Sequence, residues 1–229
     1  MKQGGVSFAP RRRQWLKRAL LGGAAMPLLL RDALAARKQP GGLVMIKGKV
    51  LINGSAAGTG TPVTPGDSVV TVRGGLAVFV VGGDAFLLRE NSELLTSGGS
   101  ALIASLRLVT GKLLSVFGRG QRSLTTPTAT IGIRGTGIYI EAEAERTYAC
   151  TCYGVVDLQA RNMPEARETV NTTHHEAPRY IYGRGEMPIK MIEVAPVKNH
   201  SDAELIMLEA LVGREPPFVG LGIQYQDYR

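Results

Sequence analysis

The stretch Ile138-Tyr139-Ile140-Glu141-Ala142-Glu143-Ala144-Glu145 carries small or apolar residues at every even position. Successive side chains of a β-strand point to opposite faces of the sheet, so this alternation predicts a half-buried strand. The side chains expected to face a core are Ile138, Ile140, Ala142 and Ala144. Those expected to face water are Glu141, Glu143 and Glu145. Like charges in a row stay solvated most easily near a sheet edge, and we expect the strand there.

The same β character extends away from this stretch in both directions. Turn signals recur from Asn53-Gly54 to Gly135-Thr136-Gly137, and short runs rich in Val, Ile, Leu and Thr lie between them. Short strands at intervals of roughly 8 to 12 residues are typical of an all-β sandwich, roll or solenoid. The sequence therefore predicts a mainly β domain of short strands over residues 43–160.

The remaining residues, 161–229, form a C-terminal extension of different character. Residues 162–178 are polar, and we expect them to wrap the β domain as a loop. Ser201 and Glu204 have the spacing of a capping box, in which each side chain bonds the other residue's backbone N–H. An apolar stripe follows, and Gly213 ends the pattern. One short amphipathic helix is predicted over 202–212.

The N-terminus accounts for most of the positive charge. The 229-residue chain has a formal net charge of +8, but residues 1–35 hold seven basic side chains and one acid, so the rest is close to neutral. The pattern of Arg12, Arg13, Trp15, Leu16 and Lys17 resembles a twin-arginine export signal.

An apolar run and a small-residue pattern follow the paired arginines. This order predicts cleavage after Ala35 and a periplasmic mature protein with no transmembrane span. Retention of the segment as an anchor is the alternative. Because the body of the chain has little net charge and few aromatic residues, nucleic-acid binding is not expected.

Residues 43–160 also resemble the FecR domain. The most specific element runs from Thr125-Thr126-Pro127-Thr128-Ala129 to Arg134-Gly135-Thr136. The resemblance implies an extracytoplasmic all-β module that contacts a partner protein, as in regulators of iron uptake. It suggests a binding or scaffold protein in the periplasm, connected with envelope signalling or iron-related regulation.

The FecR-like residues have a structural interpretation of their own. The sequence Arg134-Gly135-Thr136-Gly137 predicts a tight turn, because glycine adopts positive φ at little cost. We expect Arg134 to stabilise the fold through a buried charge pair rather than to bind a ligand.

Cys150 and Cys152, the two cysteines of the chain, lie two residues apart. On a strand both would project from one face together with Tyr148. Three states are open. A disulfide suits an oxidising compartment but needs a buckled strand, metal chelation suits a protein exported in the folded state, and inert buried thiols are the third.

Three histidines follow the cysteines within 50 residues: His174, His175 and His200. Two thiolates and one or two imidazoles suit Zn²⁺ or copper, so Cys150, Cys152 and these histidines are the candidate metal ligands. A metal- or haem-binding protein is thus the alternative to the partner-binding module. Against it, isolated histidines in polar loops are usually solvated.

No catalytic site is predicted. A cysteine with a histidine could form a nucleophile and base, but the chain has no nucleophile elbow or other local catalytic signature. We expect a non-enzymatic protein whose partner is a protein or a cell-envelope component. The sequence leaves the cofactor and the oligomeric state open.

Overall fold

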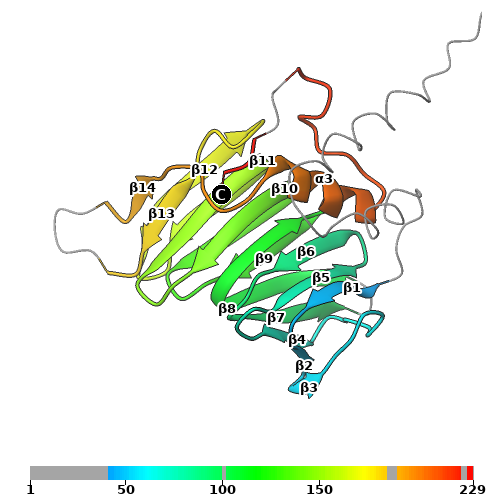
Figure 1. Ribbon diagram of the computed structural model, residues 1–229. Coiled ribbons are helices and arrows are strands. Elements are labelled where there is room, and N and C mark those ends of the chain that lie inside the picture. Colours follow the sequence, from blue (N-terminus) through cyan, green and yellow to red (C-terminus); the bar gives the residue numbers. More distant parts are fainter. Residues whose placement is uncertain (1–40, 100–101, 185–189, 223–225, 229) are drawn as a thin grey trace, which may run out of the picture.

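The computed structural model describes residues 41–99, 102–184, 190–222 and 226–228. The predicted export signal lies outside these residues. Within them, one sheet of 14 strands and one helix form the fold (Figure 1), which confirms the mainly β prediction. The strands are β1 (Gly42–Lys47), β2 (Val50–Ile52), β3 (Ser55–Ala56), β4 (Ser68–Thr71), β5 (Leu76–Val81), β6 (Asp84–Leu88), β7 (Ser92–Gly99), β8 (Leu102–Val116), β9 (Gln121–Thr125), β10 (Ala129–Ala142), β11 (Arg146–Ala160), β12 (Met163–Thr172), β13 (Arg179–Tyr182) and β14 (Ile192–Val194), and the helix is α3 (Asp202–Leu211).

Three strands are much longer than the short strands that the sequence predicts. β8 and β11 have 15 residues each and β10 has 14. Each changes partners along its length: the first half of β8 pairs with β7 and β9, and its second half with β6 and β10. At the change, Gly111 has φ +95°, and a Cβ there would overlap Ser92. Glycine therefore lets one strand serve two parts of the sheet.

These strands connect two halves of the sheet. We call the half on which residues 195–221 lie the cover-side half. It contains β1, β5, β6, the second halves of β8 and β10, the first half of β11, β13 and β14. The far half contains β2, β3, β4, β7, β9, β12 and the other halves of the long strands. Phe79 and Ile140 of the cover-side half share one buried cluster with Leu94 and Ile131 of the far half. The main core thus lies between the halves.

The 138–145 stretch follows the predicted alternation only in its first part. Ile138, Ile140 and Ala142 face the main core, as predicted. Ala144 is exposed, because β10 ends at Ala142 and a turn follows. Glu141 is buried, not solvated, since the C-terminal residues cover the outer face of this strand. It accepts hydrogen bonds from Tyr139, Lys198 and Asn199.

The C-terminal region differs from the predicted loop. Residues 163–172 form β12, which pairs with β11 and extends the sheet past residue 160. The predicted helix is present as α3, and its capping box is formed: Ser201 Oγ accepts from Glu204 N–H, and Glu204 accepts from Ser201 N–H. α3 lies over the outer face of the cover-side half, where it contacts β6 and β8 (Figure 1).

The FecR-like residues have structural roles in this sheet. Thr126, in the turn before β10, is buried and bonds Thr147 and the N–H of Ala129, while Pro127 lies half-buried beside it. Gly135 has φ +58° at a bulge in β10. The hydroxyl of Thr136 is buried without a partner among the described residues.

The prediction of a buried charge pair for Arg134 is wrong. Arg134 bonds Asp157 at 2.9 Å, but the two side chains are 58% and 42% exposed. Both stand on the outward side of the far half, where water screens the pair, so the contribution to stability is small.

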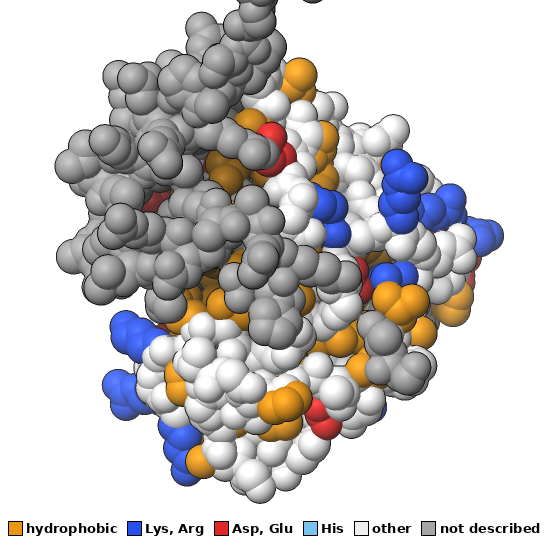
Figure 2. Space-filling view, turned by 90° about the vertical axis from the view of Figure 1, so that its right-hand side faces the viewer, with side chains coloured by type: hydrophobic (Ala, Val, Ile, Leu, Met, Phe, Trp, Pro, Cys, Tyr) orange, Lys and Arg blue, Asp and Glu red, His pale blue; other side chains and the backbone are white. Residues whose placement is uncertain are grey.

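The basic side chains on one face of the molecule are dispersed. On the face seen in Figure 2, Lys and Arg side chains lie in separate small groups. Nothing in the described part of the chain combines the length and hydropathy that a membrane-spanning helix needs.

Candidate metal centre

β11 positions the two cysteines. Cys150 and Cys152 project from the outer face of the cover-side half, as the strand periodicity predicts, and Tyr148 shares that face. Both are fully buried free thiols. The disulfide is therefore not formed in this structure. The thiol of Cys152 instead donates to the carbonyl of Cys150 at 3.6 Å.

The fold brings two of the three histidines to these thiols. His175 follows β12 and has φ +53°, and His200 stands directly before the cap of α3. Cys150 Sγ lies 3.6 Å from His175 Nδ1, and His175 Nδ1 lies 2.9 Å from His200 Nε2. One donor atom from each of Cys150, Cys152, His175 and His200 lies within 4.8 Å of the other three, and all four residues are buried. These histidines are not the solvated loop residues of the alternative interpretation.

The outer nitrogens of both imidazoles are held by hydrogen bonds. His200 Nδ1 lies 2.7 Å from the carbonyl oxygen of Lys198, which can only accept, so Nδ1 carries a proton. His175 Nε2 lies 2.9 Å from Asp202 Oδ1. Ionised Asp202 also only accepts, so His175 Nε2 is a donor. The nitrogens that remain for an ion are the two that face each other beside the thiols.

Hydrogen bonding separates the acidities of the two thiols. The neighbouring Cys152 side chain holds the pKa of Cys150 well below its ordinary value, and His175 and His200 act in the same direction. Burial raises the pKa of Cys152. Burial would lower the pKa of His175, but its hydrogen bonds to Asp202 and Cys150 outweigh burial and raise the pKa to about 9.

His174 belongs to the same cluster but points elsewhere. Its Nε2 donates to Asp202 Oδ1 at 2.8 Å, so one carboxylate oxygen accepts from both neighbouring histidines. Asp202 Oδ2 accepts from the backbone N–H of Gln226 at 2.8 Å. Burial would raise the pKa of Asp202, but the hydrogen bonds from His175, Gln226 and His174 lower it. Asp202 is therefore an ionised carboxylate that holds both imidazoles in place.

Aromatic rings enclose the imidazoles. Tyr139 stacks on His200 with ring centroids 4.7 Å apart, Phe218 lies 4.7 Å from His174, and Tyr228 lies 5.2 Å from His175. A porphyrin needs a wide flat cavity, whereas these rings already occupy the space around the imidazoles. The geometry suits a single ion and does not suit haem.

Two of the donor separations can be compared with those around a tetrahedral zinc ion. With Zn–S about 2.3 Å and Zn–N about 2.0 Å, sulfur and nitrogen ligands lie about 3.5 Å apart and two nitrogens about 3.3 Å apart. The corresponding separations here are 3.6 Å for Cys150 and His175 and 2.9 Å for His175 and His200. The two nitrogens need to separate by roughly 0.4 Å to reach ideal coordination.

Sequence reasoning missed two buried carboxylates near the site. Asp202 looks like an ordinary acidic residue in the first turn of a helix, where it would favour the macrodipole. Glu141 has the pattern of a solvated strand surface. Both are buried because residues 195–222 fold back over β10 and β11, and no local pattern reports that contact.

Comparisons with known proteins give little information on function. No family model and no curated protein matches the chain. Two crystal structures of a predicted anti-sigma factor from Parabacteroides distasonis are similar, each with 15% sequence identity and TM-scores of 0.46 and 0.45. The similar region covers 56% of this chain and 58% of theirs. A likeness of this degree carries no functional information, and the FecR resemblance stays a prediction.

Proposed function

We propose that this is a non-enzymatic metal-binding protein that holds one Zn²⁺ ion between Cys150, Cys152, His175 and His200. The observation that carries the proposal is the convergence of four buried donor atoms within 4.8 Å of one another. Two thiolates and two imidazoles are a common structural zinc set, and four protein ligands leave no open position for substrate.

The donor chemistry narrows the choice of ion. Sulfur and imidazole donors disfavour Ca²⁺ and Mg²⁺, which take oxygen ligands. Copper(I) is the main competitor, because thiolates bind it strongly. Zn²⁺ is favoured because two sulfur and two nitrogen donors in a closed set are typical of structural zinc sites. Asp202 and the Lys198 carbonyl hold the two imidazoles in orientation, as expected for metal-bound histidines.

Burial argues against catalysis at the thiols. Cys150 and His175 have the spacing of a nucleophile and base, but the side chain of His175 is 1% exposed and Cys150 is fully buried. The two surface depressions described, one lined by Leu95 and Arg107 and one by Gln159 and Arg167, lie away from the cluster.

The partner-binding role in the periplasm is a second proposal, and the sequence alone supports it. The twin-arginine-like pattern and the FecR resemblance favour export and contact with a protein or envelope component. Cell fractionation with a C-terminal tag tests export. A processed form in the periplasm supports the prediction, and an unprocessed form confined to the cytoplasm overturns it.

The metal proposal is tested by elemental analysis of the full chain purified with a reducing agent. We expect about one zinc per chain, with both thiols protected from a thiol reagent until a chelator is added. His175→Ala should lower zinc affinity by more than the 10- to 100-fold that loss of a second-shell partner costs.

The matched control is the neighbouring residue. His174→Ala removes an equal side chain that bonds Asp202 but contributes no donor to the four-atom set. It should retain stoichiometric zinc. Stoichiometric copper in place of zinc would correct the ion, whereas a metal-free wild-type protein that takes up neither ion would overturn the proposal.

A further inference from the structure

The outer face of the cover-side half is closed by residues 195–221, which we call the C-terminal cover. Its apolar side chains pack on the sheet in a second cluster, separate from the main core. The buried members from the cover are Ala195, Leu205, Met207, Leu208, Leu211, Val212 and Phe218. The cover therefore forms one layer that packs on the outer face of the sheet.

The sheet face beneath the cover is strongly apolar. Val78 and Val80 of β5, Leu87 of β6, and Leu114 and Val116 of β8 are each at most 1% exposed. Soluble proteins seldom present a continuous apolar surface of this kind to water. The strength of the cover's attachment thus decides whether this face is hidden.

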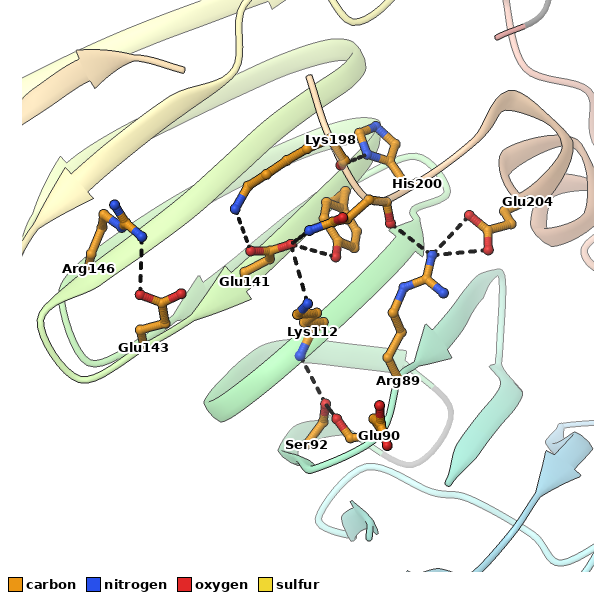
Figure 3. A network of polar contacts seen from close by, with 12 residues as sticks. Arg89, Glu90, Ser92, Lys112, Glu141, Glu143, Arg146, Lys198, His200 and Glu204 are labelled. Atoms are coloured by element: carbon orange, nitrogen blue, oxygen red, sulfur yellow. Dashed lines mark hydrogen bonds and ion pairs between the residues drawn. The ribbon is translucent and has the colours of Figure 1, made fainter. Parts of the chain in front are cut away.

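Polar ties hold the cover at both ends of α3. Arg89 of the sheet region bonds Glu204 and the carbonyl of Asn199, and Lys198 bonds Glu141 (Figure 3). Near the other end Arg214 bonds Glu209 of the cover itself and also donates to the carbonyl of Gly83, between β5 and β6. The three basic side chains are 23–32% exposed, whereas their carboxylate partners are only 4–10% exposed.

The proposed metal centre would attach the cover to the sheet in a different way. Its ligands come from three separate segments: Cys150 and Cys152 from β11, His175 from the loop after β12, and His200 from the cover itself. His200 directly precedes Ser201, the cap of α3. An ion bound here would join the start of the helix to the sheet through coordinate bonds.

We propose that the ion is the clamp of the C-terminal cover, so that its loss lets the cover open while the core between the two halves stays folded. The inference rests on the proposed zinc site and adds a regulatory consequence to it. The metal-free protein would transiently present the apolar outer face of β5, β6 and β8, and the zinc-loaded protein would keep α3 on that face.

Hydrogen exchange read by mass spectrometry tests the clamp on the full chain. The zinc-loaded protein and the protein treated with EDTA are compared under reducing conditions. At free zinc about 100 times the dissociation constant, an opening that releases the ion is suppressed about 100-fold. Amides of Asp202–Leu211 should therefore exchange about 100 times faster without zinc. Amides of β4 and β7 in the far half should exchange at equal rates in both samples.

Two variants sharpen the test. Leu208→Ala weakens the packing of α3 without touching a ligand, and it should speed exchange in both samples while keeping the large ratio between them. Asp157→Asn, at an exposed position of β11 in the far half, should leave both the exchange rates and the ratio unchanged.

The possible outcomes separate the clamp from the zinc site. If zinc binds stoichiometrically but the amides of α3 exchange at the same rate with and without zinc, the clamp is refuted and the metal site is still supported. Equal acceleration in α3, β4 and β7 also overturns it, because the ion would then stabilise the whole fold. Failure to bind zinc overturns both.

Discussion

Asp202→Asn tests whether the carboxylate orients the zinc ligand His175. Asp202 is fully buried and accepts three N–H bonds of 2.8–2.9 Å, from His174, His175 and Gln226. An amide has one accepting oxygen, so its NH₂ group must face either the imidazoles or the Gln226 N–H. Because a donor then opposes a donor, at least one bond is lost.

The expected loss of zinc affinity follows from the hydrogen bond by which Asp202 orients His175. Removing a partner of a zinc-bound histidine typically lowers metal affinity 10- to 100-fold, or about 1.4–2.7 kcal/mol. We expect a loss in this range in competition titrations with a chromophoric chelator. The Co²⁺ form should keep the absorption of a tetrahedral thiolate site, because the four ligands are unchanged.

The control is the same substitution at a different position, Asp157→Asn. Asp157 lies on the same strand as the cysteines, its side chain is 42% exposed, and it pairs only with surface groups. This variant should bind zinc with wild-type affinity. Wild-type affinity in Asp202→Asn as well would refute the reasoning, because the carboxylate would then have no part in holding the ligand.

Four further outcomes are expected. Cys150→Ser and Cys152→Ser should destabilise the zinc-loaded protein non-additively in a double-mutant cycle of urea unfolding, because either change breaks the same site; independent small effects would indicate inert thiols. Leu208→Ala should lower the free energy of unfolding by about 2–5 kcal/mol, since it leaves a cavity under α3, and a loss below about 1 kcal/mol would show that the cover packs loosely. Arg134→Ala should change stability by less than about 1 kcal/mol because the pair is exposed, and a larger loss would restore the structural role that the sequence suggested. Burial would raise the pKa of Glu141, but hydrogen bonds from Lys198, Asn199 and Tyr139 lower it. The contribution of Glu141 to the free energy of unfolding is therefore complete above the ordinary glutamate pKa and is lost as pH falls through the lowered pKa. Glu141→Gln should make the free energy of unfolding fall less steeply at acid pH, and an unchanged dependence on pH would contradict this.

Local patterns predicted the parts of the fold that depend on neighbouring residues. The alternation from Ile138 to Ala142 gave the buried strand, and the spacing of Ser201 and Glu204 gave the helix start. The long bent strands were not predictable in the same way. Whether Gly111 ends a strand or bends it depends on Ser92, which lies against it from another strand, and a turn signal looks the same in both cases.

The same distinction applies to the candidate site: local patterns predicted some of its features, and contacts between distant segments decide the others. Strand periodicity placed Cys150 and Cys152 on one face, and donor chemistry selected the histidines as partners. Proximity to His200 depends on the return of the cover across β11, some 50 residues later in the chain. The same return buries Asp202 and Glu141, which local sequence marks as surface acids.

The spacing of the cysteines gives the metal site a consequence for export. Extended residues two apart hold their Cα atoms about 6.5–7 Å from each other, at the limit of disulfide reach, so a bond between Cys150 and Cys152 would be strained and easily reduced. Reduced thiols in an oxidising compartment need protection, and coordination in a closed, buried site supplies it. A twin-arginine signal fits this requirement, because export in the folded state lets the ion bind in the reducing cytoplasm first. The export signal predicted at one end of the chain and the clamp proposed near the other therefore support each other chemically.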